Sequence, residues 1–283
     1  MKPLRRRILI VEDSDALREL LLELLEKPEY EIVGAADGAV AWNLLDRNHF
    51  DLVLLDLGLP GISGFEILQR LQSRPHPSNS PKVIVMTGDD TPETVLRAVQ
   101  GQAYQFISKP AQRATYLDAV EQALSQTAEV LPIEVVSAKP DWVELLVPCQ
   151  LEIADRIQSF MLGLNAKLPQ EVRESTGLAF HELLMNALEW GGQLDPNRKV
   201  RIACLRFSRF LQYRIQDPGP GFNPAELQHA AVSNDPDHPH GHMAVRIEKG
   251  IRPGGFGLLM SHTLVDEIIY NEAHNEVAFI KYL

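Results

Sequence analysis

The sequence predicts an α/β protein of two domains, a doubly wound parallel sheet followed by a second α/β domain with a mixed or antiparallel sheet. Two patterns lead to this fold class. In the first 125 residues, five short apolar runs alternate with helical patterns, as in a parallel sheet covered on both faces. The second half carries helical patterns and then strand runs joined by a short turn, which is typical of an antiparallel hairpin. A length of 283 residues is sufficient for two hydrophobic cores.

Composition narrows the class of protein. The net charge of -11 argues against a broad nucleic-acid surface. No apolar run approaches the roughly 18 residues that a membrane helix needs, and the apolar run after the basic N-terminus is too short for a signal peptide. Two cysteines, Cys149 and Cys204, suit a reducing compartment. We therefore expect a cytoplasmic protein without direct contacts to membrane or nucleic acid.

The first domain is predicted over residues 1–125 as a (βα)5 unit. Its strands are apolar runs that end at polar residues, at 7–11, 31–35, 51–55, 82–86 and 104–107. Its helices show apolar residues at helical spacing, at 17–25, 39–46, 65–71, 94–100 and 115–123. Such sheets place their sites at the carboxyl ends of the strands.

The chemistry-bearing residues follow those strand ends: Glu12, Asp13, Asp56, Thr87 and Lys109. Three carboxylates in one pocket repel each other strongly in a low dielectric, and Mg²⁺ relieves this repulsion through oxygen ligands. A carboxylate can also act as a nucleophile and become an aspartyl phosphate. Lys109 and Thr87 would then bind the new phosphoryl oxygens.

This pattern resembles a response-regulator receiver domain of the chemotaxis-regulator type, a flavodoxin-like fold. The resemblance implies that Asp56 is the phosphoacceptor and that Glu12, Asp13, Asp56 and the Gly58 carbonyl hold Mg²⁺. It implies that Thr87 and Lys109 sense the phosphate and that Phe106 is an aromatic switch. Gly88 departs from the small residue, often alanine, that is usual there, and we expect no effect from it.

A linker is predicted at residues 126–140, with a short strand at 133–136, and the second domain at 141–283. The proline-rich run at 73–81 is a loop inside the first domain. The second domain is predicted to contain strands at 142–147, 200–207, 210–216, 267–271 and 276–282, and helices at 151–164, 175–190 and 258–265. The polar segment between them, residues 223–253, is predicted to be a lid over a ligand.

Two glycine clusters and one helix suggest a nucleotide site in this domain. Asp217 sits between a strand and the Gly219–Gly221 turn, where its carboxylate could accept from an adenine amino group. The second cluster, at 254–257, opens an apolar helix, and backbone N–H groups at such a point receive phosphates. Glu182 and Asn186 are four residues apart on a helical pattern and therefore share a face.

These residues resemble the GHKL ATPase superfamily, an α/β sandwich, and within it the anti-sigma-factor serine kinase branch. The resemblance implies that Glu182 is the general base, that Asn186 binds Mg²⁺ and that Asp217 contacts the adenine amino group. It implies that Gly219 and Gly221 let the backbone approach the base, and that Gly255 and Gly257 cradle the phosphates of ATP. Trp190 departs from the histidine that often precedes the glycine in this branch, and we expect it to alter packing near the site.

Two histidine patterns suggest a further function, a phosphoacceptor at His181 and a zinc site in the polar segment, but both are less favoured than structural roles for the same residues. His181-Glu182 copies the dipeptide of a histidine-kinase phosphoacceptor box, but the residues that follow fit the ATPase motif. His181 is therefore expected to be a histidine on the helix surface. The histidines at 238, 240 and 242 do not match a familiar zinc spacing, and we assign them to the lid.

The sequence thus predicts a bacterial two-component response regulator whose phosphorylation at Asp56 controls an ATP-binding output domain. The resemblance implies a protein serine/threonine kinase that acts on an anti-sigma-antagonist-like partner. Two alternatives stay open: an ATP-binding module that sequesters a sigma factor or antagonist without turnover, and a histidine-kinase-type phosphotransfer enzyme. The phosphodonor would be a cognate histidine kinase or phosphotransfer protein, and both parent families favour a homodimer.

Overall fold

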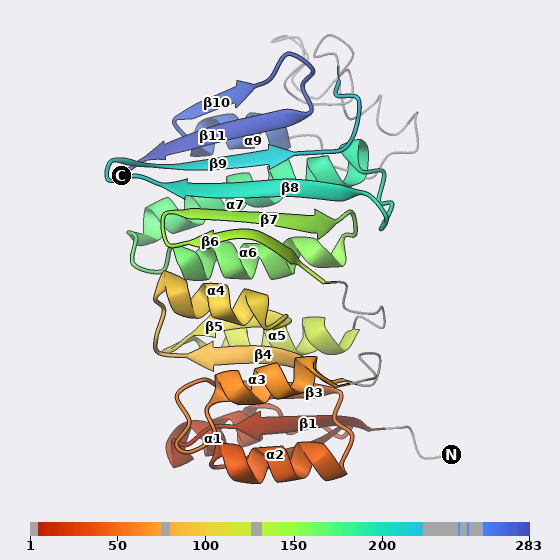
Figure 1. Cartoon of the computed structure of the whole chain (residues 1–283), viewed down its shortest axis with the longest axis vertical. Helices are drawn as coiled ribbons and strands as arrows, with labels where there is room; N and C mark the ends of the chain where they lie inside the picture. Colours follow the sequence, from red (N-terminus) through yellow and green to blue (C-terminus); the bar gives the residue numbers. More distant parts are fainter. Residues whose placement is uncertain (1–4, 75–79, 126–131, 223–242, 244–247, 249–256) are drawn as a thin grey trace. The chain divides into compact units, whose positions relative to one another are not determined.

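The computed structural model describes residues 5–74, 80–125, 132–222, 243, 248 and 257–283 (Figure 1). In the first half, strands and helices alternate in the order β1 Arg6–Val11, α1 Asp15–Leu24, β2 Tyr30–Ala35, α2 Gly38–Arg47, β3 Leu52–Asp56, α3 Gly64–Gln72, β4 Lys82–Thr87, α4 Pro92–Gln100, β5 Gln105–Ser108 and α5 Arg113–Ser125. The second half contains β6 Glu134–Lys139, β7 Trp142–Pro148, α6 Glu152–Leu164, α7 Gln170–Asn186, β8 Lys199–Arg206, β9 Phe210–Gln216, α9 Gly257–Leu264, β10 Glu267–Tyr270 and β11 Glu276–Tyr282. All five strands and five helices predicted for the first half are confirmed.

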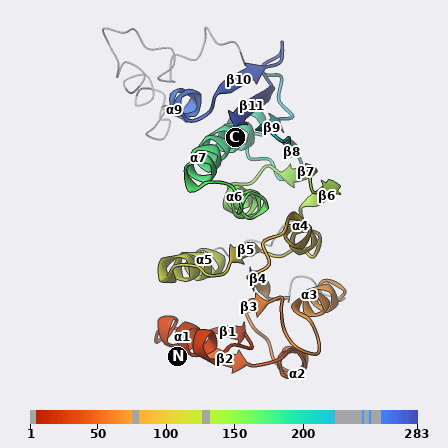
Figure 2. The same cartoon turned by 90° about the vertical axis from the view of Figure 1, so that its left-hand side faces the viewer.

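The first sheet is parallel, with strand order β2-β1-β3-β4-β5. Helices α1 and α5 lie on one face and α2, α3 and α4 on the other (Figure 2). The central strand β3 is buried at every position because both of its faces are covered. Every strand points the same way, so the residues that follow β1, β3, β4 and β5 gather at one edge.

Side-chain hydrogen bonds cap the N-termini of three helices in this domain, α2, α3 and α4. The Asp37 side chain accepts from the Val40 N–H at 2.8 Å, and Ser63 accepts from the Glu66 N–H at 3.3 Å. Thr91 accepts from the Thr94 N–H at 3.4 Å. Each bond satisfies a backbone donor that the first helical turn leaves without a partner.

The second sheet is antiparallel throughout, with strand order β10-β11-β9-β8-β7-β6. Helices α6, α7 and α9 lie on one face of it (Figure 2). Strand β6 falls within residues 126–140, where the sequence predicts a linker with a short strand, and it pairs with β7. The predicted hairpin of β8 and β9 is confirmed, with Arg206 opposite Leu211.

Helix α7 carries the predicted buried residues Phe180, Leu183 and Leu184, but it is not one regular helix to Trp190. It ends at Asn186, and a π-helical turn, Ala187–Gly191, follows. The Gly192 N–H donates to the Ala187 carbonyl at 2.8 Å, a bond that spans five residues. The prediction of a single helix was therefore wrong at its end, because apolar residues at helical spacing cannot distinguish a π turn from a further α turn.

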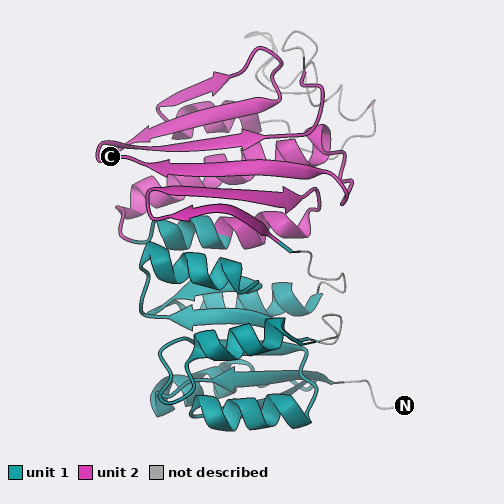
Figure 3. Cartoon of the chain, viewed as in Figure 1, with its two compact units in different colours: residues 1–132, 159–166 teal, residues 133–158, 167–283 magenta. Residues whose placement is uncertain are grey.

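The chain divides into two compact units (Figure 3). The first comprises Met1–Pro132 and Ser159–Ala166, and the second comprises Ile133–Gln158 and Lys167–Leu283. Within the described residues, none of the helices combines the length and the apolar character that crossing a membrane requires. Cys149 and Cys204 are both buried, and neither forms a disulfide.

Candidate functional site

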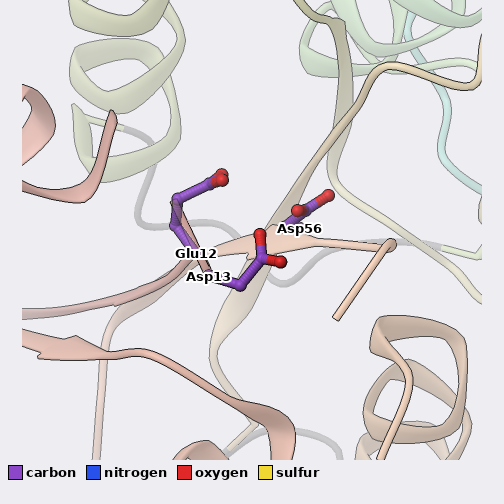
Figure 4. A group of neighbouring side chains, drawn as sticks. All are labelled: Glu12, Asp13 and Asp56. Atoms are coloured by element: carbon purple, nitrogen blue, oxygen red, sulfur yellow. The ribbon is translucent and has the colours of Figure 1, made fainter. Parts of the chain in front are cut away.

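An acidic cluster forms at the carboxyl edge of the parallel sheet. Glu12 and Asp13 follow β1, Asp56 ends β3, and one oxygen from each lies within 4.8 Å of the others (Figure 4). Glu12 and Asp56 are buried, with 1% and 5% of their surface exposed, and Asp13 is exposed. A cluster of hard oxygen donors with one open side fits a small divalent cation such as Mg²⁺.

Lys109 bridges the two buried carboxylates. Its Nζ lies 3.0 Å from Glu12 Oε2 and 3.0 Å from Asp56 Oδ2. Burial disfavours the ammonium, but the hydrogen bonds to Glu12 and Asp56 outweigh it, and the net effect raises the pKa of Lys109. The lysine therefore stays cationic at neutral pH and offsets part of the negative charge in the cluster.

Burial also disfavours the charged form of the neighbouring acid, Glu12. It raises the pKa of Glu12, and the nearby Asp56 charge adds to the rise, while Lys109 opposes both. Tyr116 packs under the same edge, and burial raises its pKa as well. The cluster thus stores carboxylate repulsion that a cation would relieve.

The other residues predicted for this site lie on β4, on β5 and in the segment after β3. Thr87 ends β4, is 3% exposed, and its Oγ1 accepts from the Asp89 N–H at 3.0 Å. The Gly58 N–H donates to Asp56 Oδ1 at 3.1 Å. Phe106 is buried on β5. The structure therefore brings Asp56, Lys109 and the two other carboxylates together. The roles predicted for these residues, and for Gly58, Thr87 and Phe106, stay predictions.

In the second unit, Asp217 follows β9 and opens the segment 217–221, called the first glycine box. Its Oδ1 accepts from the Gly219 N–H at 2.7 Å. Burial raises the pKa of this carboxyl, while the Gly219 N–H and the Arg198 charge oppose the rise. The contact to Gly219 holds Oδ1 in place, and the carboxylate keeps further acceptor capacity for a ligand.

Glu182 and Asn186 lie on α7, one turn apart, with both side chains partly exposed. A Cβ placed on Gly257 would lie 2.2 Å from Glu182 Oε2, so the carboxylate reaches the first residue of α9. The N-terminal end of a helix is where backbone N–H groups favour phosphate. The structure thus joins Glu182 and Gly257, which are predicted to serve the same site.

Gly221 has a φ of +85°, in the left-handed region that suits glycine. Gly255 and nearly all of the predicted lid, residues 223–253, lie outside the described residues. The phosphate role of Gly255 and the lid function therefore stay predictions.

Gly191 is a site residue that the sequence did not single out. A Cβ on it would lie 2.1 Å from Asp217 Cγ and 2.2 Å from Asp217 Oδ1. The π turn delivers this glycine to the back of the carboxylate, and its neighbour Gly192 packs in the same way on the Cys149 sulfur. The Gly191-Gly192 pair at the end of a helical pattern was the available signal.

A methyl group at position 191 should displace the Asp217 carboxylate. Overpacking of this kind typically costs about 1–3 kcal/mol, so we expect Gly191→Ala to weaken ATP binding about 5- to 150-fold. Isothermal titration with ATP measures this. The control is Gly88→Ala, because a Cβ there would meet nothing within 4 Å. Equal ATP affinity in the Gly191 variant and the wild type would contradict the assignment of Gly191 to the site.

His181 has one imidazole nitrogen, Nδ1, buried in the protein. It is half-buried on α7, and its Nδ1 is buried and has no hydrogen-bond partner among the residues that the structure describes. Its environment gives no support to the interpretation of His181 as a phosphoacceptor.

Two family models match the chain. The model for the response regulator receiver domain matches residues 8–121, and the model for the histidine kinase-like ATPase domain matches residues 149–281. The two matched regions coincide with the two sites described above. The acidic cluster lies in the first, and Glu182, Asp217 and Gly257 lie in the second.

Curated relatives match over part of the chain. The CAI-1 autoinducer sensor kinase/phosphatase CqsS of Vibrio cholerae is 34% identical over 115 residues, which are 41% of this chain and 17% of that protein. The regulatory protein VanRB of Enterococcus faecalis is 31% identical over 121 residues, which are 43% of this chain and 53% of that protein. The chain thus spans less than a fifth of the first relative and about half of the second.

Solved structures also match in part. The non-phosphorylated HemR receiver domain from Leptospira biflexa is 33% identical, with 44% of this chain and 98% of that chain covered and a TM-score of 0.41. A CheY-like response regulator receiver domain protein from Methanospirillum hungatei is 28% identical, with 43% and 94% covered and a TM-score of 0.40.

Proposed function

Because the chain contains a response regulator receiver domain followed by a histidine kinase-like ATPase domain, we propose that it is a signalling protein. In this protein, aspartyl phosphorylation controls an ATP-dependent protein kinase. The combination itself indicates two-component signalling. The proposal adds three points: the phosphorylated residue is Asp56, the output reaction is transfer to a serine or threonine hydroxyl, and the substrate is a small anti-sigma-antagonist-like protein.

In the receiver, an Asp56 oxygen attacks the phosphorus of the donor. The new oxygen–phosphorus bond forms as the bond from phosphorus to the donor breaks, and the donor leaves with that electron pair. Lys109, held within 3.0 Å of Asp56, then pairs with a phosphoryl oxygen in place of the free carboxylate. Thr87 lies at the end of the neighbouring strand, with its hydroxyl available to turn from the Asp89 N–H toward the phosphoryl group.

Glu12, Asp13 and Asp56 would hold a magnesium ion, and the close approach of their oxygens supports this. Bound there, Mg²⁺ supplies positive charge that lets an anionic phosphodonor approach a carboxylate. Without such charge, Lys109 is the cation that the structure holds between Glu12 and Asp56.

In the ATPase domain, Asp217 accepts from the adenine amino group and the start of α9 receives the phosphates. The substrate hydroxyl oxygen bonds to the γ-phosphorus as the bond to the bridging oxygen breaks, so ADP leaves. Glu182 takes the hydroxyl proton, and Asn186 serves as a metal ligand on the same helix. The observation that carries this proposal is the approach of the Glu182 carboxylate to Gly257, where α9 begins.

The test is a transfer assay with the full chain, γ-labelled ATP and candidate antagonist proteins. We expect acid-stable label on a serine or threonine of one partner. Acid-labile label would instead indicate phosphohistidine and a histidine-kinase-type enzyme. Tight ATP binding with no transfer to any partner would contradict a kinase and leave a sequestering module.

A further inference from the structure

The turn between β10 and β11 lies against the first glycine box, although 56 residues separate the two segments where they bond. The Asp217 N–H donates to the Asn275 carbonyl at 2.9 Å. The Asn275 side chain returns the contact, because its Nδ2 donates to the Gly219 carbonyl at 3.1 Å. Asn275 therefore bonds to the first glycine box on both sides of Pro218, at Asp217 and at Gly219.

The turn fixes the orientation of the Asn275 amide. Asn271 Oδ1 accepts from the Asn275 N–H at 3.1 Å and from the Glu276 N–H at 3.2 Å. Asn271 can therefore offer only its Nδ2 to the Asn275 side chain, and this donates to Asn275 Oδ1 at 2.8 Å. Because Oδ1 of Asn275 accepts from Asn271, its Nδ2 is the group that faces Gly219.

The glycine box is seated on the same turn at a second point. A Cβ on Gly221 would lie 1.6 Å from the Ala273 carbonyl oxygen, so backbone meets backbone there. The Phe222 ring packs on His274, with ring centroids 5.2 Å apart, and on Tyr270 at 5.7 Å. The box and the turn are therefore packed against each other through both backbone and aromatic rings.

This packing decides where the Asp217 carboxylate points. Gly191 blocks one side, and the Gly219 N–H ties Oδ1, so the position of Gly219 sets the direction of Oδ2. Adenine offers an amino donor at its 6-position, whereas hypoxanthine and guanine offer an oxygen acceptor there. An acceptor that is held in place gains from the first and repels the second, and one that can shift discriminates poorly.

We propose that Asn275 is a positioning residue that sets the preference of this site for adenine over 6-oxopurine nucleotides. The inference rests on the proposed ATP site at Asp217. It extends that site to a hairpin turn at the far end of the domain sequence, and it assigns Asn275 no contact with the nucleotide.

The test compares dissociation constants for ATP and inosine triphosphate in the full chain. Asn275→Asp keeps the shape and the acceptor for Asn271, but it places an oxygen against the Gly219 carbonyl. We expect this variant to bind ATP about tenfold more weakly, because a partly buried polar contact is lost and two oxygens face each other in its place. Inosine triphosphate lacks the amino group, so its affinity should change much less and the preference for ATP should shrink.

The matched control is Glu272→Ala, an exposed residue of the same turn, which should leave both affinities unchanged. Asn275→Ser is the second variant, and it gives the same comparison if the aspartate variant does not fold. An equal loss for both nucleotides would overturn the proposal, because it would mark Asn275 as a merely structural residue. A wild-type chain that binds both nucleotides equally would instead contradict the adenine contact of Asp217.

Discussion

The Asp56→Asn variant is expected to take up no phosphoryl group from acetyl phosphate under conditions that phosphorylate the wild type. The asparagine amide is nearly isosteric, so it can keep the contact to the Gly58 N–H, but it has no carboxylate oxygen that could attack phosphorus. Intact-mass spectrometry with Mg²⁺ present measures the uptake. The loss should be complete, because a nucleophile is removed and not merely a stabilising contact.

Asp46→Asn is the control for this experiment, since Asp46 is an exposed aspartate on α2. It should be phosphorylated like the wild type. Uptake by the Asp56→Asn variant at the wild-type rate would place the phosphoacceptor at another residue.

The Glu182→Gln variant should lose phosphoryl transfer by about 100- to 10,000-fold, the usual contribution of a general base. Glutamine keeps the size of the side chain beside Gly257 but cannot accept the hydroxyl proton. ATP binding should change little, because the adenine contact at Asp217 and the start of α9 are unaltered. Rates of transfer to the partner protein and ATP dissociation constants separate the two effects.

Glu171→Gln is the matched control, since Glu171 is an exposed glutamate in the first turn of the same helix. It should transfer phosphate at the wild-type rate. If Glu182→Gln reduced ATP affinity and transfer by the same factor, Glu182 would be a binding residue and not the base.

The receiver site could be predicted almost completely from sequence, and the reason is topological. In a parallel sheet, residues that follow strands meet at one edge, so the positions of Glu12, Asp56 and Lys109 follow from the strand pattern alone. The structure confirms that these three come together. The strand pattern could not predict which side chains contact each other, for example that Lys109 bridges both buried carboxylates.

The ATPase site was predicted less fully because its contacts are long-range. Glu182 and Asp217 belong to recognisable motifs, but Gly191 reaches Asp217 through a π turn, and Asn275 reaches Gly219 from the last hairpin. No local periodicity encodes either contact, since each depends on how separate strands and helices pack. For the same reason, β6 could be expected only as a short run and not as the edge strand of the second sheet.

The central claim is that phosphorylation of Asp56 changes how the ATPase domain binds ATP, and ATP affinity before and after phosphorylation tests it most directly. The full chain is treated with acetyl phosphate, the modification is verified by mass, and the ATP dissociation constant is measured with Asp56→Asn carried through the same treatment. Coupling between sites typically changes affinity about 5- to 150-fold, so we predict a shift of at least about fivefold in the wild type and none in the variant. An unchanged dissociation constant in fully phosphorylated wild-type protein would contradict the account.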